Sequence, residues 1–119
     1  RTRLSDAMTL ETAGDVLVVV LEGRLDSSNS KEVEQELMQA IEGRGSVVID
    51  FGGLSYISSA GLRVVLLVGK RMRAARGRLA LCSLPSTIRE VFEISGFLSI
   101  FDVHDSRDEA VSAVAERAS

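Results

Sequence analysis

The chain has 119 residues, of which 45% are hydrophobic and only 4% aromatic, so it is long enough for one domain with a core of Val, Leu, Ile and Ala. Lys and Arg number 14 and Asp and Glu 17, which gives a formal net charge of −3. This acidic balance argues against direct contact with nucleic acid, because such proteins usually carry a basic surface.

The first third of the chain predicts an antiparallel hairpin followed by a helix. Residues 1–7 are expected to form an N-terminal extension. Apolar and polar residues alternate over 8–12 as in a half-buried strand, and the run 16–21 is apolar on both faces, as in a central strand. Residues 23–26 are then expected to leave the sheet, and a helix with an acidic outer face is predicted over about 31–42.

The middle of the chain predicts a third strand and a long helix. The strand covers 47–49, and Asp50 with the Gly pair at 52–53 is expected to end it. The helix covers about 59–76. Val64 and Leu67 fall opposite its main apolar stripe, so they either contact another element, which we favour, or are exposed for a partner. The predicted stripe comprises Leu62, Val65, Leu66, Gly69 and Met72.

The last third predicts a fourth strand over 78–82, a helix that begins near Pro85, a short strand within 97–101 and a terminal helix to about residue 115. Asp105 or Ser106 is expected to cap the terminal helix, and residues 116–119 to form a C-terminal tail. In the helix after Pro85, the residues expected to face the core are Val91, Phe92 and Ile94.

The predicted order is β-β-α-β-α-β-α-β-α, with one domain over residues 8–115. Strand-helix-strand units require parallel pairing, while the opening strand should pair antiparallel at or near an edge. The sequence therefore predicts an α/β fold with a mixed, mostly parallel β-sheet of about five strands and about four helices.

The sequence contains no complete motif for catalysis or for cofactor binding. Ser59 has Gly61 two residues after it but Ile57 two residues before it, so the G-x-S-x-G elbow of a serine hydrolase is incomplete. Asp50 ends a strand without the neighbouring acidic pair that a phospho-accepting aspartate needs for its metal, so we interpret it as structural. One Cys and one His exclude a Cys/His metal site, and no nucleotide-binding fingerprint is present. We expect no enzyme activity, no metal and no cofactor.

Cysteine usage and hydropathy indicate a cytoplasmic protein. Cys82 has no intramolecular disulfide partner, which fits a reducing compartment, and its apolar surroundings indicate a core position. No apolar run approaches the ~18 residues of a membrane span, so we expect no membrane insertion.

Two serines, Ser58 and Ser59, lie where the long helix is predicted to begin. A serine hydroxyl at an N-cap accepts from a first-turn N–H, and the helix start favours an anion, so a phosphate would be tolerated here. The plain alternative is that both serines only cap the helix. At the other end of the same helix, five cations are either a solvated C-terminus or a docking edge for a partner. These are Lys70, Arg71, Arg73, Arg76 and Arg78.

A family resemblance runs through residues 48–66, VIDFGGLSYISSAGLRVVL, and through Gly23-Arg24-Leu25-Asp26. The first stretch resembles the signature of STAS domains, specifically of the bacterial anti-sigma factor antagonists, and the second resembles that family's G-x-L-D loop. The similarity covers about residues 8–115.

The resemblance implies a regulatory binding module. Its partner would be an anti-sigma factor that is also a serine kinase. Ser59 would be the phosphorylated residue, with Ser58 as the less favoured acceptor. Phosphorylation would release the partner, and a PP2C-type phosphatase would restore the unphosphorylated form. Asp26 would lie beside the acceptor and help kinase engagement. The implied partner surface comprises Asp26, Ser58, Ser59, Ala60, Gly61, Arg63, Val64 and Leu67.

One position departs from the family pattern, because Ser58 stands where Asp commonly precedes the phosphoserine. An alternative within the same family is a STAS module without a switch, either a scaffold of a signalling assembly or the cytoplasmic domain of an anion transporter. Self-association is compatible with both readings.

Overall fold

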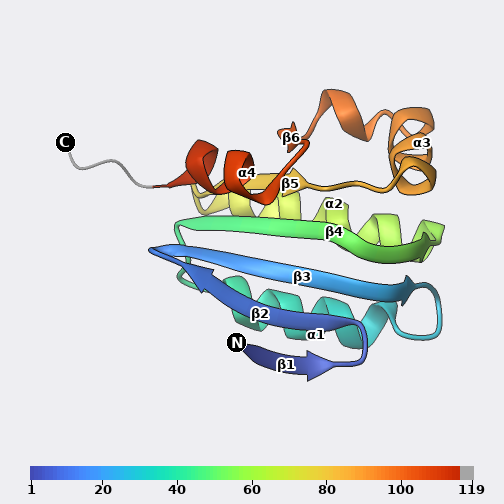
Figure 1. Cartoon of the computed structure of the whole chain (residues 1–119). Helices are drawn as coiled ribbons and strands as arrows, with labels where there is room; N and C mark the ends of the chain where they lie inside the picture. The colour runs from blue at the N-terminus through green and yellow to red at the C-terminus, as the bar shows by residue number, and fades with distance from the viewer. Residues whose placement is uncertain (116–119) are drawn as a thin grey trace.

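The computed structural model describes residues 1–115, which form a β-sheet with helices on both of its faces (Figure 1). The predicted tail at 116–119 lies outside the described residues. The strands are β1 (Thr2–Ser5), β2 (Met8–Ala13), β3 (Val16–Leu25), β4 (Ser46–Ile57), β5 (Arg78–Cys82) and β6 (Val103–His104). The helices are α1 (Ser30–Ile41), α2 (Ser59–Ala74), α3 (Ser86–Ile94), the 3₁₀ helix η1 (Phe97–Ser99) and α4 (Arg107–Val114).

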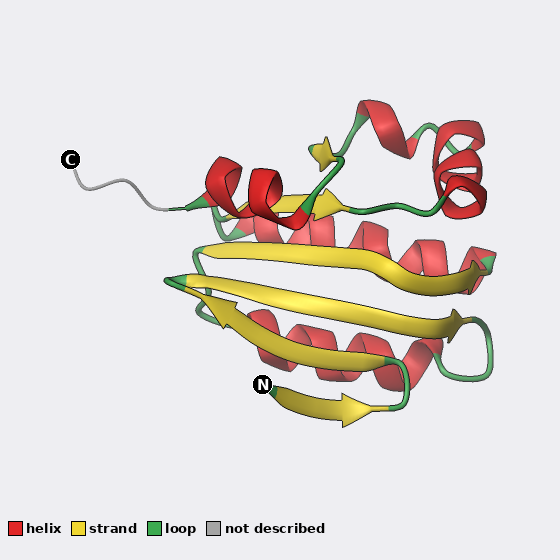
Figure 2. Ribbon diagram, in the orientation of Figure 1, coloured by secondary structure: helices red, strands yellow, loops and turns green. Residues whose placement is uncertain are grey.

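The strands lie side by side in chain order, β1-β2-β3-β4-β5-β6. Pairing is antiparallel from β1 to β3 and parallel from β3 to β6. The helices α1, α2 and α3 belong to one apolar cluster, while α4 packs against the other face of the sheet (Figure 2). The predicted mixed, mostly parallel α/β fold is therefore confirmed.

Residues 1–7 do not form the predicted extension, because Thr2–Ser5 is strand β1 and pairs with β2. Arg3 lies opposite Thr9 in this pairing. β1 therefore occupies the edge of the sheet that the prediction gave to the strand beginning near Met8. A polar strand of four residues shows no alternation of apolar side chains, so it can be identified only from its pairing with β2.

The predicted end of the third strand at the Gly pair is wrong. β4 continues through Gly52 and Gly53 to Ile57, and β3 continues through Gly23 and Leu25 beside it. The register between the two strands shifts twice, which places extra residues on β4 as bulges. A Cβ on Gly53 would lie 3.2 Å from the Leu21 carbonyl oxygen, so this glycine permits a close approach of the strands.

The core of α2 differs from the predicted stripe. Its buried residues include Val64 and Val68, and the Val64 side chain is only 1% exposed. Val64 therefore contacts another element, as favoured, and the predicted partner contact at Val64 is wrong because a partner cannot reach it. Leu67 is half-buried.

The predicted strand within 97–101 is also wrong. Phe97 begins η1, and the last strand is β6, further along the chain. Phe97 packs edge-on against Phe92 and tilted against Phe101, at centroid distances of 5.4 Å and 5.5 Å. The two phenylalanines of this segment, Phe97 and Phe101, thus take part in aromatic packing and not in a strand. Ile94, predicted to face the core, is 84% exposed, because α3 buries Ile88 and Phe92, four residues apart.

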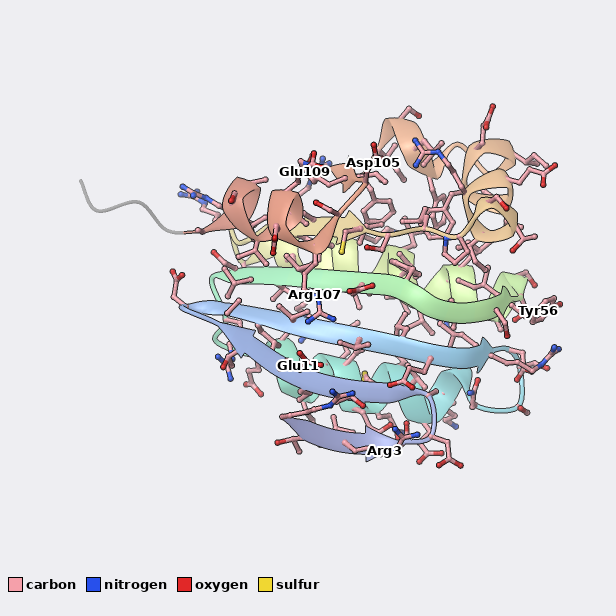
Figure 3. The ribbon with its side chains drawn as sticks, viewed as in Figure 1. Arg3, Glu11, Tyr56, Asp105, Arg107 and Glu109 are labelled. Carbon is pink, nitrogen blue, oxygen red and sulfur yellow. The ribbon has the colours of Figure 1, made fainter. Side chains whose placement is uncertain are left out.

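The helix α4 is held to its face of the sheet by ion pairs. Arg107 Nε lies 2.9 Å from Asp50 Oδ2, and its Nη1 lies 2.9 Å from Glu11 Oε1 (Figure 3). Burial alone would lower the pKa of Arg107, but the hydrogen bonds to Asp50 and Glu11 outweigh it and raise that pKa. Ser106 caps α4 by accepting from the Glu109 N–H, as one predicted alternative had it. The structural interpretation of Asp50 agrees with these contacts.

Cys82 lies on the same face and is fully buried, and burial raises the pKa of its thiol. The predicted core position of Cys82 is confirmed. None of the helices among residues 1–115 is long and apolar enough to cross a membrane.

Candidate phosphoacceptor site

The strand β4 leads directly into α2 through a single residue, Ser58. Ser58 has an extended backbone and is the N-cap of α2, where its hydroxyl oxygen accepts from the Gly61 N–H at 3.2 Å. Its carbonyl oxygen accepts from the Leu62 N–H at 2.9 Å. Ser58 is therefore engaged in starting the helix, and the prediction of a serine-capped helix start is confirmed.

Ser59, the first residue of α2, is exposed. Its hydroxyl makes no hydrogen bond within residues 1–115, in contrast to that of Ser58. The unpaired N–H groups of a first helical turn and the positive end of the helix dipole favour an anion at this place. The two serines thus separate into one that caps and one whose hydroxyl stands open to solvent.

The end of β3 is bonded to this helix start. The Ser58 N–H donates to the Leu25 carbonyl oxygen at 3.0 Å, so the loop that begins at Asp26 lies against the serines. A Cβ on Gly61 would lie 2.7 Å from that same carbonyl oxygen and 2.7 Å from Ile57 Cγ1. Gly61 is therefore required by packing, because a side chain there would push α2 off the end of β3.

Asp26 organises the loop between β3 and α1. Its Oδ1 accepts from the Ser28 hydroxyl at 2.6 Å and from the Ser28 N–H at 2.9 Å, while Arg24 Nε lies 3.3 Å from Oδ2. These hydrogen bonds, those from Ser28 first, lower the pKa of the Asp26 carboxyl. Asp26 therefore holds the loop as a carboxylate and adds negative charge beside the helix start.

The remaining predicted site residues extend along the first turns of α2. Ala60 is half-buried, and Arg63 is exposed, with its Nη1 3.5 Å from Glu34 Oε1 on α1. Arg63 follows Ser59 by four residues, so the two side chains lie on one face of α2. The structure thus brings Asp26, Ser59 and Arg63 to one end of the fold.

Two further residues lie at this end and were not predicted as site residues, Arg24 and Tyr56. The Arg24 guanidinium lies 4.3 Å from the centroid of the Tyr56 ring, which is the geometry of a cation–π pair. Tyr56 is 42% exposed at the carboxyl end of β4 (Figure 3). Extending the strands beyond 21 and 49 would have placed both residues on one sheet face, since they are partners in register.

The histidine of this chain does not belong to the elements that carry Ser59. His104 lies on β6, where its Nε2 is 2.9 Å from Asp102 Oδ1. No three His, Cys, Asp or Glu residues among 1–115 are grouped so as to hold a metal ion. The arrangement offers an exposed hydroxyl for modification at the start of α2.

Comparison with known protein families matches residues 7–110 to the STAS domain. This chain belongs to the STAS domain family. A Bordetella bronchiseptica protein that is named as an anti-sigma factor antagonist, BtrV, is 50% identical over 107 residues, which are 89% of this chain and 92% of that protein.

Solved structures of family members share the fold of this STAS domain. The anti-sigma factor antagonist SpoIIAA in its unphosphorylated form matches with a TM-score of 0.78 and 27% identity, over 95% of this chain and 100% of that one. The Bacillus SpoIIAA in its phosphorylated form matches with a TM-score of 0.70 and 28% identity, over 91% and 99%. The resemblance to anti-sigma factor antagonists is confirmed by these matches.

Proposed function

We propose that this STAS domain is an anti-sigma factor antagonist that is switched by phosphorylation of Ser59. In its unphosphorylated form it binds an anti-sigma factor with serine kinase activity and so releases the sigma factor. A PP2C-type phosphatase returns the phosphorylated form to the binding state. The names of the relatives support the antagonist role. The main support for a switch at Ser59 is that the Ser58 hydroxyl is used to cap α2, whereas Ser59 is exposed.

The helix start favours a phosphate on Ser59 rather than on Ser58. A phosphate on Ser58 would displace the cap that accepts from the Gly61 N–H, whereas one on Ser59 leaves this hydrogen bond in place. Ser58 also caps without charge. An aspartate there would repel a neighbouring phosphate of about −1.5 to −2 charges, so a neutral cap makes the phosphorylated state less costly.

A phosphate on Ser59 would change the surface more than the fold. Arg63 lies one helical turn further on and pairs with Glu34 across the α1–α2 contact. The phosphate would compete with Glu34 for this guanidinium and would place negative charge beside Asp26. The partner surface therefore becomes more negative, and this change of charge would release a bound kinase without unfolding the domain.

The test uses an anti-sigma factor serine kinase from the same organism, with ATP and mass spectrometry to map the phosphate. We expect phosphate on Ser59 in the wild type and in Ser58→Ala, and none in Ser59→Ala. Ser59→Ala should bind the kinase whether or not ATP is present, and Ser59→Asp should bind it more weakly. Ser86→Ala, at the exposed first residue of α3, is the matched control and should behave as the wild type.

Phosphate on neither Ser58 nor Ser59, with kinase binding intact, would refute the switch and leave the alternative of a STAS module without one. Failure to bind the kinase at all would refute the antagonist role.

A further inference from the structure

A groove of about 590 Å³ lies at the end of α2 that is remote from Ser59. The C-terminal half of α2 forms one wall and residues 99–102 form the other. At a rise of 1.5 Å per residue, the α2 lining of the groove begins about 10 Å along the helix from Ser59, at Leu66, and continues to the helix end. Its apolar lining includes Leu66, Met72, Leu79, Ile100 and Phe101.

The rim of the groove is basic. Lys70, Arg73 and Arg76 line it, and none of them forms an ion pair within residues 1–115. Asp102 also lines the groove, but its carboxylate lies 2.9 Å from His104 Nε2. Ile100 is 58% exposed at the same place. The groove therefore suits an apolar side chain flanked by carboxylates, and it is basic on a protein whose net charge is −3.

A surface of that kind is present on α3 of the same chain. Ile94 at the C-terminal end of α3 is 84% exposed, the most of any large hydrophobic residue that the structure describes. Glu90 and Glu93 beside it are exposed and form no ion pair within the described residues. Ile94 does not line the groove of its own molecule.

We propose that the groove receives the α3 end of a second copy of this chain. Ile94 of one copy enters the groove of the other, and Glu90 and Glu93 face the basic rim. In the proposed dimer the contact is made twice around a two-fold axis, so that the groove and the α3 end of each copy are both occupied. The contact is distinct from the phosphoacceptor end of α2, and the proposal does not depend on the switch.

Complementary charge argues for a second copy as the occupant. An exposed Ile beside two glutamates leaves apolar surface in water when the chain is alone, and the groove offers both apolar contact and opposite charge. The ion pairs would be exposed at the rim, so the association should weaken as salt rises.

Sedimentation equilibrium of the full chain tests the proposal, from micromolar to millimolar concentration at low salt. We expect the wild type to shift from monomer to dimer as concentration rises, and added salt to reverse the shift. Ile94→Ser should weaken the dimer without lowering the melting temperature, because its side chain makes little core contact.

Two charge-reversal variants make the test specific. The groove variant carries Lys70→Glu, Arg73→Glu and Arg76→Glu, and the helix variant carries Glu90→Lys and Glu93→Lys. Each alone should dimerise at least about tenfold more weakly than the wild type, since like charges then meet at both contacts. An equal mixture should form a heterodimer, because every groove then faces a helix of opposite charge.

Lys31→Glu, on the exposed surface of α1, is the matched control and should dimerise as the wild type does. Melting temperatures show whether each variant is folded. A wild type that stays monomeric at millimolar concentration and low salt would overturn the proposal. So would a mixture of folded variants that associates no better than either variant alone.

Discussion

The two ends of α2 differ in how they are built. At the start, backbone contacts fix the helix: the Ser58 N–H donates to the Leu25 carbonyl oxygen at 3.0 Å, and Gly61 leaves no room for a side chain. At the far end, the helix presents exposed cations beside an open groove, and Arg76 leaves it with a positive φ of 57°. The start of α2 is thus held by a backbone hydrogen bond and close packing, and the far end presents exposed side chains beside the groove.

The difference follows the helix dipole as well as the packing. The start favours negative charge, which suits a phosphate on Ser59, and the end favours the positive charge that Arg71 and Arg73 supply in the last turn. One helix can therefore serve two kinds of contact with little interference.

Glycine-to-alanine changes at the two ends should differ most. In Gly61→Ala the new Cβ would meet the Leu25 carbonyl oxygen at 2.7 Å, and backbone there cannot move without breaking the joint with β3. We expect the free energy of unfolding to fall by about 1–3 kcal/mol. The measurement is urea denaturation followed by circular dichroism.

Gly69→Ala is the matched control near the groove. Its new Cβ would meet the ring of Phe101 at 2.6 Å, but this ring is only half-buried and can shift. The gain in helix propensity from Gly to Ala, about 1 kcal/mol, offsets part of the clash. If both variants lost the same free energy of unfolding, the idea that only the start of α2 packs against backbone that cannot shift would be contradicted.

The two serines should differ next. Ser58→Ala removes the hydroxyl that accepts from the Gly61 N–H and should lower the free energy of unfolding by about 1 kcal/mol. Ser59→Ala removes an exposed hydroxyl and should stay within about 0.5 kcal/mol of the wild type. Thermal and urea unfolding of both variants measure this difference. A larger loss for Ser59→Ala would mean that Ser59, not Ser58, stabilises the helix start.

The smallest expected effect is the coupling of a phosphate on Ser59 to Arg63. A guanidinium four residues away stabilises the dianionic phosphate, so Arg63→Gln should raise the second pKa of the phosphoserine, by an amount equivalent to about 0.3 kcal/mol. Titration of the phosphorylated protein by ³¹P NMR measures it. Lys70→Gln, at the far end of α2, is the control and should leave this pKa unchanged. An unchanged pKa in Arg63→Gln would show that Glu34 keeps the guanidinium.

Much of the architecture is predictable from local patterns. The helical periods, the strand over 78–82 and the cap at Ser106 are carried by neighbouring residues, so the structure agrees with them to within a few residues. The errors concern residues whose environment depends on distant partners. Val64 and Ile94 are both apolar helix residues, yet one is 1% exposed and the other 84%, because packing with other elements decides which apolar face is covered.

Local sequence patterns were enough to predict the element types over most of the chain and the serine-capped start of α2, because capping and periodicity act within a few residues. The tertiary structure was needed to establish that β4 runs through Gly52 and Gly53 to reach Ser58, since β3 pairs with that segment and bulges absorb the extra residues. It also decided that β1 becomes an edge strand and that the groove opens between α2 and residues 99–102. Strand pairing and packing bring together residues that are far apart in the chain, so they cannot be predicted from a local sequence pattern.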